Sequence, residues 1–253
     1  MKSREQFVSE LARNAASFFG KKQIFESLYE GDVQHQFEIN QFNKFITSIG
    51  MNSQVLDLAC GNGRFSYQLA QKTNHTLAYD LSCSGLKSAR TKCQTSNVTF
   101  IKGSMFELPY RDNTFDAIWF SEAFEYVPVD RRENFLRILQ RILKSKGFLY
   151  ISAETWMHPS LKKSLRRFLK DLELFFYWRY LKRKPVLYGE FLYNLSSKNE
   201  STDNPTWHYR THIDKWKLAG LLRKVGFKIL SLNLHVIQRW ETGYLYVISR
   251  KTE

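Results

Sequence analysis

The most constraining feature of this sequence is a short apolar run that ends in an acid and leads directly into a glycine-containing turn. Residues 55 to 66 read VLDLACGNGRFS, with Gly61 and Gly63 inside the turn. Glycine adopts backbone conformations that other residues avoid, and it lets a ligand approach the main chain closely. Free N–H groups at a helix start favour anionic groups. The segment therefore predicts a strand, a ligand-binding loop and the start of a helix.

The chain continues as an alternation of short apolar runs and helical patterns. Strands are predicted at VLDLA, TLAYD, VTFIK, FDAIWF and GFLYISAE, with helices at FSYQLAQK, SGLKSARTKC and ENFLRILQRILK between them. Such alternation favours right-handed crossovers and a parallel sheet that binds ligands outside the carboxyl ends of its strands. Asp57, Asp80, Ser104 and Ser121 all fall at predicted strand ends. At 253 residues, the chain fits one α/β domain with an elaboration.

Two acids narrow the kind of nucleotide that the loop would bind. A dinucleotide site calls for a third glycine where this chain has Ser66, and it does not need Asp57. A carboxylate buried at a strand end is costly unless a cation or a hydrogen-bond donor meets it, so Asp57 suits a ligand that carries an ammonium group. Asp80 closes the next apolar run about twenty residues after the loop, where an α/β nucleotide site places a carboxylate against ribose hydroxyls. A nucleoside with a methionine tail has both groups.

From Val55 to Ser152 the chain resembles the class I S-adenosylmethionine-dependent methyltransferases, in particular the small, single-domain, type 11-like members. The segments VLDLACGNG, YDLSCSGLKSAR and FIKGSMFELPYRDNTFDAI carry the resemblance, in order and in spacing. It implies a doubly wound, mostly parallel seven-stranded sheet with helices on both faces and an antiparallel last strand. We also expect a helical insertion after the fifth strand. The implied cofactor is S-adenosyl-L-methionine.

The resemblance also implies which residues hold the cofactor. Asp57 and the two glycines would surround the methionine moiety, Asp80 would contact the ribose, and Ser104 with Met105 would lie beside the adenine. The full expected set is Asp57, Ala59, Cys60, Gly61, Gly63, Asp80, Leu81, Ser104, Met105 and Ser121. Within this set, we expect Cys60 to be a small buried filler and not a nucleophile, because no neighbouring cation suggests a thiolate.

Two positions depart from the family pattern. Ala59 stands where the family usually has its first glycine, and alanine is tolerated there as long as φ is negative. Ser104 stands where an acid commonly accepts the adenine amino group. Because a hydroxyl is uncharged and shorter, the adenine would be recognised by backbone groups or held more weakly.

The chain is expected to divide into four segments. They are N-terminal helices that cover the site (1–50), the cofactor-binding core (51–155), a basic, aromatic, helical insertion (156–205), and a C-terminal helix with two strands that complete the sheet (206–253). Aromatic and titratable residues gather in PTWHYRTH, at the start of the last segment, where Thr211 or His212 would begin the helix.

Half of the net charge of +14 comes from one stretch, 161–184, which has nine Lys or Arg against Asp171 and Glu173. A helix there would place Leu161, Leu165, Phe168, Leu172 and Phe175 on one face. The stretch is either a solvated cationic helix packed on the body, or an element that lies on a lipid interface, follows a nucleic-acid backbone or covers a small apolar substrate. All four interpretations are open from the sequence.

Three cysteines, Cys60, Cys83 and Cys93, have no paired spacing, which argues against a disulfide scaffold and against a metal site. We therefore expect a reducing, cytoplasmic compartment. No apolar run approaches the roughly 18 residues of a membrane span, so no transmembrane segment is expected. Peripheral contact with a membrane surface is left open as a partner interaction. The oligomeric state is also open.

Methyl transfer from a sulfonium depends mainly on alignment, so a base is needed only when the acceptor must first lose a proton. The candidates are Glu122, Glu125, His158 and His208. The first hypothesis is a methyltransferase for a small-molecule or lipid-like acceptor. The alternatives are methylation of tRNA or another RNA through residues 161–184, and a non-catalytic binding protein with a degraded cofactor pocket.

Overall fold

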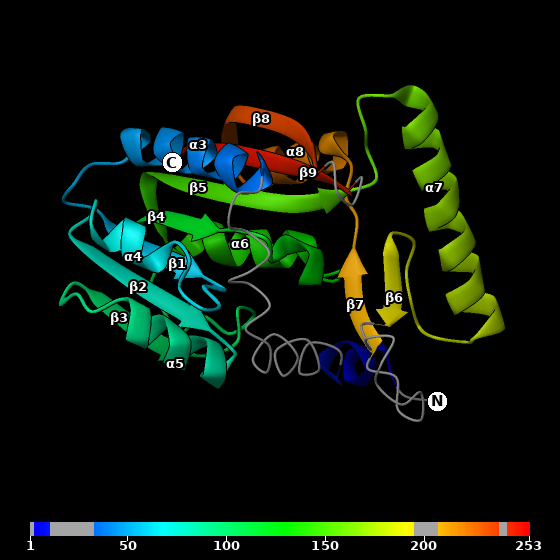
Figure 1. Ribbon diagram of the computed structural model, residues 1–253, viewed down its shortest axis with the longest axis horizontal. Helices are drawn as coiled ribbons and strands as arrows, with labels where there is room; N and C mark the ends of the chain where they lie inside the picture. Colours follow the sequence, from blue (N-terminus) through cyan, green and yellow to red (C-terminus); the bar gives the residue numbers. More distant parts are fainter. Residues whose placement is uncertain (1–2, 11–32, 195–206, 238–241) are drawn as a thin grey trace.

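The computed structural model describes residues 3–10, 33–194, 207–237 and 242–253, and its centre is a seven-stranded sheet (Figure 1). The strand order is β3-β2-β1-β4-β5-β9-β8. The strands are β1 (Gln54–Leu58), β2 (His75–Asp80), β3 (Val98–Lys102), β4 (Phe115–Phe120), β5 (Leu143–Thr155), β8 (Phe227–Ile237) and β9 (Thr242–Lys251). The first five strands pair in parallel, and β9 is antiparallel to both of its neighbours. The predicted doubly wound, mostly parallel sheet with an antiparallel last strand is confirmed.

Helices cover both faces of this sheet because its strands are apolar on both sides. The helices are α3 (Val33–Ser48), α4 (Ser66–Ala70), α5 (Cys83–Lys92), α6 (Arg132–Ile142) and α8 (Lys215–Lys224). On one face α6 and α8 pack against alternate strand residues such as Leu56 and Ile118. On the other, Phe45 of α3 packs against Trp119, whose ring stacks on that of Tyr150 with centroids 3.6 Å apart. This α/β/α sandwich fixes the carboxyl ends of β1, β2, β4 and β5 at one edge.

Element boundaries differ from the sequence prediction at two places. The helix expected over ENFLRILQRILK ends at Ile142, and β5 begins directly at Leu143. Helix α8 begins at Lys215 and not at Thr211 or His212, because Asp214 caps it by accepting a hydrogen bond of 2.8 Å from the backbone N–H of Lys217. At the N-terminus, residues 4–10 are helical, and the rest of the first predicted helix lies outside the described residues.

The segment after β5 contains more than helix. Helix α7 (Leu161–Phe176) continues into a wider π turn, η2 (Tyr177–Leu181), and is followed by strand β6 (Glu190–Asn194). Strand β6 pairs with β7 (Trp207–Thr211) in a separate two-stranded antiparallel sheet. The boundary expected after residue 205 therefore separates two strands that form one hairpin.

Residues 4–10, 161–194 and 207–211, which we call the cap, share a small core of their own. Phe7, Trp178 and Phe191 are among its buried side chains. At its centre the buried carboxylate of Glu190 accepts hydrogen bonds from the Arg4 guanidinium at 2.6 Å and from the Tyr209 hydroxyl at 2.7 Å. The cap lies beyond the carboxyl end of β5 (Figure 1, right), so it borders the edge where a ligand would bind.

Candidate active site

The predicted glycine turn follows β1, and its two glycines have different roles. Both have positive φ, 55° at Gly61 and 79° at Gly63. A Cβ added to Gly63 would lie 2.7 Å from the Cβ of Ala89 on α5, so this glycine is needed for helix packing. A Cβ added to Gly61 would meet nothing within 4 Å. The turn therefore presents its backbone to open space at Gly61, which is what close approach by a ligand requires.

Ala59 is more strained than the sequence suggested. Its φ is +57°, in the left-handed region, whereas we expected a tolerated alanine at negative φ. The Cβ of an L-residue crowds the following carbonyl in this conformation, at a cost of about 1–2 kcal/mol. The turn keeps this strain because β1 holds the backbone before Ala59, and hydrogen bonds from the N–H groups of Cys60 and Gly61 to Tyr79 and Asp80 hold it afterwards.

Two carboxylates flank the turn, of which Asp57 is buried and Asp80 is partly buried. Asp57 accepts a hydrogen bond of 2.6 Å from the Ser66 hydroxyl, and burial raises its pKa to about 7, with a further contribution from the charge of Asp80. Asp80 accepts from the backbone N–H of Gly61 at 2.8 Å and from that of Ser82 at 2.7 Å. Burial also raises the pKa of Asp80, although these N–H groups oppose the shift. The structure therefore brings the two predicted acids to one loop.

The remaining expected cofactor residues lie at neighbouring strand ends. Leu81 follows β2 and is exposed, whereas Cys60 is buried, and burial raises the pKa of its thiol, so it is a neutral filler as expected. The Ser104 hydroxyl accepts a hydrogen bond of 3.3 Å from the N–H of Phe106. Met105 packs against the main core. Thus the loop after β3 is held by its own backbone, and the Ser104 hydroxyl is engaged within it.

Ser121 directly follows β4 and belongs to a polar cluster that also contains Glu38, Arg64 and Glu122. Its hydroxyl donates to the carboxylate of Glu38, which α3 supplies, and Glu38 also accepts from Arg64 at 2.7 Å. Burial raises the pKa of Glu38 to about 7, and the Arg64 charge opposes this rise. Glu122 has a positive φ of 49°, and its carboxylate lies 3.6 Å from Arg64. Arg64 thus links the glycine turn to the ends of α3 and β4.

Sequence reasoning missed Glu38. It lies within an apolar helical pattern, FEINQFNKF. The one sequence feature that could have indicated a role for Glu38 is that it is an acid beside phenylalanines that face the sheet. Such an acid is stable in a core only when it is paired, and its partner is 26 residues away in sequence, in the turn.

A second charged cluster joins the cap to the end of β5. Glu154 accepts a hydrogen bond of 3.0 Å from Arg210 of β7, and its carboxylate lies 3.7 Å from Nε2 of His212. Nδ1 of His212 lies 2.7 Å from the carboxylate of Asp171 on α7. Burial disfavours the charged forms of Glu154 and His212. Even so, Arg210 and His212 hold the pKa of Glu154 at about 2, and the two carboxylates raise that of His212.

Glu125, in the short 3-10 helix η1 (Phe124–Tyr126) after β4, faces this cluster. Burial raises its pKa to about 8, and the positive charge of Arg210 opposes the rise. Within the part of the chain that the structure describes, Oε2 of Glu125 is buried without a hydrogen-bond partner. It is a proton-binding group in a buried, charged environment.

The two predicted histidines do not join this cluster in the described contacts. Nδ1 of His158 accepts a hydrogen bond of 2.9 Å from the N–H of Ser160, and its backbone pairs with Ser164, so His158 organises the start of α7. His208 lies in β7, and its side chain falls outside the described residues. His212 is the histidine that the structure places against Glu154. The sequence named His208 as the candidate in this stretch and considered His212 only as a possible helix start; His208 stays a prediction.

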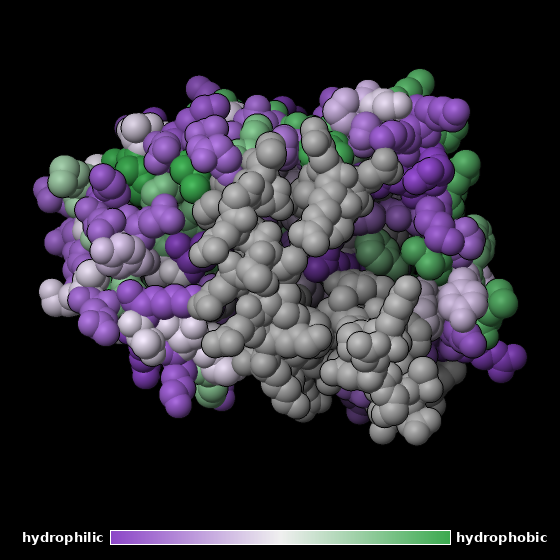
Figure 2. All heavy atoms as spheres, viewed as in Figure 1, coloured by the Kyte–Doolittle hydropathy of each residue, from purple (hydrophilic) through white to green (hydrophobic). Residues whose placement is uncertain are grey.

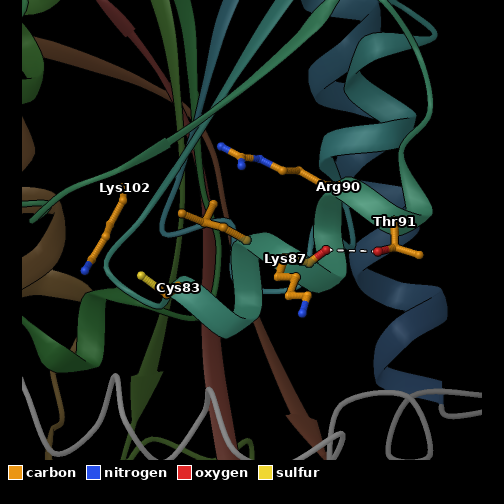
Figure 3. Close-up of a pocket in the computed structure, with 6 residues that line it drawn as sticks. Cys83, Lys87, Arg90, Thr91 and Lys102 are labelled. Atoms are coloured by element: carbon orange, nitrogen blue, oxygen red, sulfur yellow. Dashed lines mark hydrogen bonds between the residues drawn. The ribbon is translucent and has the colours of Figure 1, made fainter.

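A shallow hollow of about 370 Å³ lies beside α5 (Figure 3). It is lined by Cys83, Leu86, Lys87, Arg90, Thr91 and Lys102. None of the expected cofactor residues is part of this lining. Over the described ranges, no three or more His, Cys, Asp or Glu residues are grouped so that they could hold a metal ion. The described helices include none with the length and apolarity to cross a membrane.

The strain at Ala59 predicts that Ala59→Gly stabilises the protein. Relief of the left-handed alanine exceeds the entropy that glycine adds to the unfolded chain, so we expect about 0.5–1 kcal/mol more stability. Urea unfolding measures it, with Gly63→Ala as the comparison, which must destabilise because of the contact with Ala89. If the urea midpoint of Ala59→Gly were at or below that of the wild type, Ala59 would not be strained.

Comparison with known proteins agrees with this geometry. The methyltransferase domain family model matches residues 56–151. The phthiotriol/phenolphthiotriol dimycocerosates methyltransferase of Mycobacterium tuberculosis is 29% identical over 48% of this chain, which spans about half (45%) of that relative's length. The ubiquinone/menaquinone biosynthesis C-methyltransferase UbiE of Cellvibrio japonicus is 27% identical over 87% of this chain and 86% of its own length.

Solved structures agree on the fold. The 1,6-didemethyltoxoflavin-N1-methyltransferase of Burkholderia thailandensis, crystallised with its substrate and S-adenosylhomocysteine, superposes with a TM-score of 0.68. The superposition covers 100% of this chain and 92% of the chain of that enzyme, and the two sequences are 14% identical. The match identifies residues 56–151 as a methyltransferase domain, and the glycine turn and its two flanking acids lie within that domain.

Proposed function

We propose that this protein transfers the methyl group of S-adenosylmethionine to a small-molecule or lipid-like acceptor. The observation that carries the proposal is a pair of carboxylates, the buried Asp57 and the partly buried Asp80, on the two sides of a glycine turn at the carboxyl edge of the sheet. The names of the relatives support the acceptor class, since they include methyltransferases of dimycocerosates and of quinone biosynthesis.

The residues of the turn fit this cofactor. Gly61 has room beside its Cα, and Asp80 has acceptor capacity left, because its two oxygens offer about four lone-pair sites and backbone N–H groups occupy only part of them. Asp57 is a buried carboxyl that an ammonium group would stabilise in its charged form. When bound, S-adenosylmethionine supplies a methyl group already activated on sulfonium, so the task of the chain is to hold and align the acceptor.

The acceptor would lie on the side of the turn where β4 and β5 end. There the chain provides Glu122, Glu125 and Glu154 together with Arg210, all placed by strand ends or by the cap. Tyr244 of β9 is buried and lies within the electrostatic influence of Glu154 and Glu125. A small acceptor would find both an aromatic surface and charged groups to orient it.

Within this arrangement we propose Glu125 as the base for an acceptor that must lose a proton. Its pKa of about 8 is close to working pH, and a carboxylate with a raised pKa binds the proton more strongly. Its Oε2 has no partner in the described structure that would compete for the proton. Glu122, by contrast, has its carboxylate 3.6 Å from the Arg64 guanidinium and is engaged in that ion pair.

Cofactor binding tests the foundation of the proposal. In calorimetric titrations with S-adenosylmethionine, Asp80→Asn should raise the Kd by tenfold or more, because hydrogen bonds to a charged acceptor are worth about 1.5–3 kcal/mol. Asp112→Asn is the matched control, since Asp112 is exposed and pairs with Arg141 far from the turn. Absence of binding by the wild type at millimolar cofactor would end the proposal.

The role of Glu125 predicts a pH profile. Because the base acts when deprotonated, kcat/KM for an acceptor that must lose a proton should rise with pH to a plateau above about 8. Glu125→Gln should lower kcat by a factor of about 10² or more and abolish the rise, and Glu125→Asp should restore part of it. The assay would use phenol, quinol and lipid acceptors.

An unchanged profile in Glu125→Gln would remove the residue from catalysis. Cofactor binding without turnover of any acceptor would favour the non-catalytic alternative.

A further inference from the structure

The outer surface of α7 and η2 carries exposed apolar side chains. Leu161 is 84% exposed, Leu165 56%, Leu169 53% and Phe176 53%. Tyr180 and Leu181 of η2 continue the series at 62% and 73%. We call these six residues the apolar stripe. The sequence placed Leu161 and Leu165 on one apolar face of the predicted helix, and the structure leaves both side chains exposed.

A different side of α7 is fixed to the body, so the stripe cannot turn inward. Ser164 and Asp171 are buried, and Asp171 contacts His212. Arg167 donates a hydrogen bond of 2.9 Å to the carbonyl oxygen of Thr155 at the end of β5. Phe168 packs edge-on against Trp156. The helix has therefore three sides: one buried, one apolar and exposed, and one charged.

The charged side is strongly basic. The exposed cations of α7 and of the segment that follows η2 are Lys162, Lys163, Arg166, Lys170, Lys182, Arg183 and Lys184. Figure 2 shows hydrophobic and hydrophilic side chains beside one another along the right-hand edge, where α7 stands in Figure 1. The cations border the apolar stripe and do not interrupt it.

The exposed apolar side chains and the cations beside them together indicate which kind of partner binds this surface. A second copy of this chain would bring an equally basic helix against the first, and like charges repel. A nucleic acid would pair with the cations but leave Leu161, Leu165 and Leu169 in water, because bases stack on aromatic and not on aliphatic side chains. An anionic lipid surface matches both sides: phosphates meet the cations, and the leucines enter the boundary of the acyl chains.

We propose that the apolar stripe and its flanking cations dock the protein on the surface of an anionic membrane. The docked helix is joined through Arg167 and Asp171 to the end of β5 and to His212, so the cluster of Glu154 and Arg210 lies next to the lipid contact. A lipid-like acceptor would then reach the acceptor side of the site from the bilayer surface. The docking itself does not depend on the reaction.

Co-sedimentation with vesicles tests the proposal. We expect the wild type to bind vesicles of phosphatidylglycerol and phosphatidylcholine, to bind pure phosphatidylcholine at least tenfold more weakly, and to lose affinity as salt increases. Leu165→Glu/Leu169→Glu should lower binding at least tenfold. The matched control is Met51→Glu, because Met51 is 78% exposed and precedes β1, away from α7. It should bind as the wild type does.

Circular dichroism and cofactor titration establish that each variant is folded. The proposal would be overturned if the wild type and Leu165→Glu/Leu169→Glu bound the anionic vesicles equally. It would also be overturned if Met51→Glu lost as much vesicle binding as the double variant. Single-stranded RNA bound equally by both proteins, without vesicle binding, would assign the cations to nucleic acid instead. A dimer in sedimentation velocity that the double variant loses would assign the stripe to a second copy. Failure to dock would leave cofactor binding intact, so the two proposals fail independently.

Discussion

The account depends on the cost of burying two carboxylates at the end of a parallel sheet. Asp57 and Asp80 are removed from water by the strands and helices that make the fold, and their pKa values rise as a result. Asp80 is partly compensated by two backbone N–H groups, and Asp57 by one hydroxyl. A sheet edge that keeps such groups is built to receive a ligand with hydroxyls and a positive charge, which is how an adenosyl sulfonium amino acid presents itself.

The second organising feature is the series of charges that ties the cap to the core. Asp171, His212, Glu154 and Arg210 form a series of contacts from α7 to β7, and each contact crosses from one element to another. The carboxylates of Asp171 and Glu154 are buried, so the loss of a partner leaves an uncompensated carboxylate and is costly. The cap is therefore held in one orientation.

The core could be predicted from the sequence because its signals are local. Each strand of the parallel sheet is a short apolar run, and the turn at Gly61 and Gly63 follows the first of them directly. The cap and the polar cluster around Glu38 could not be predicted, because their contacts join residues that are distant in sequence. Arg4 meets Glu190, and Glu38 meets Arg64 and Ser121, across separations that no periodicity reveals. For the same reason the sequence did not single out His212, and the strain at Ala59 required the backbone dihedral.

The central claim is that the buried carboxyl of Asp57 receives the cofactor's ammonium group. Asp57 has a pKa of about 7 in the free protein, so it is mostly protonated at pH 6, and a bound ammonium would lower that pKa. Calorimetric titration of S-adenosylmethionine at pH 6 in two buffers of different ionisation enthalpy measures the result. We expect release of roughly one proton per site, and its loss in Asp57→Asn. Binding without proton release by the wild type would contradict this account.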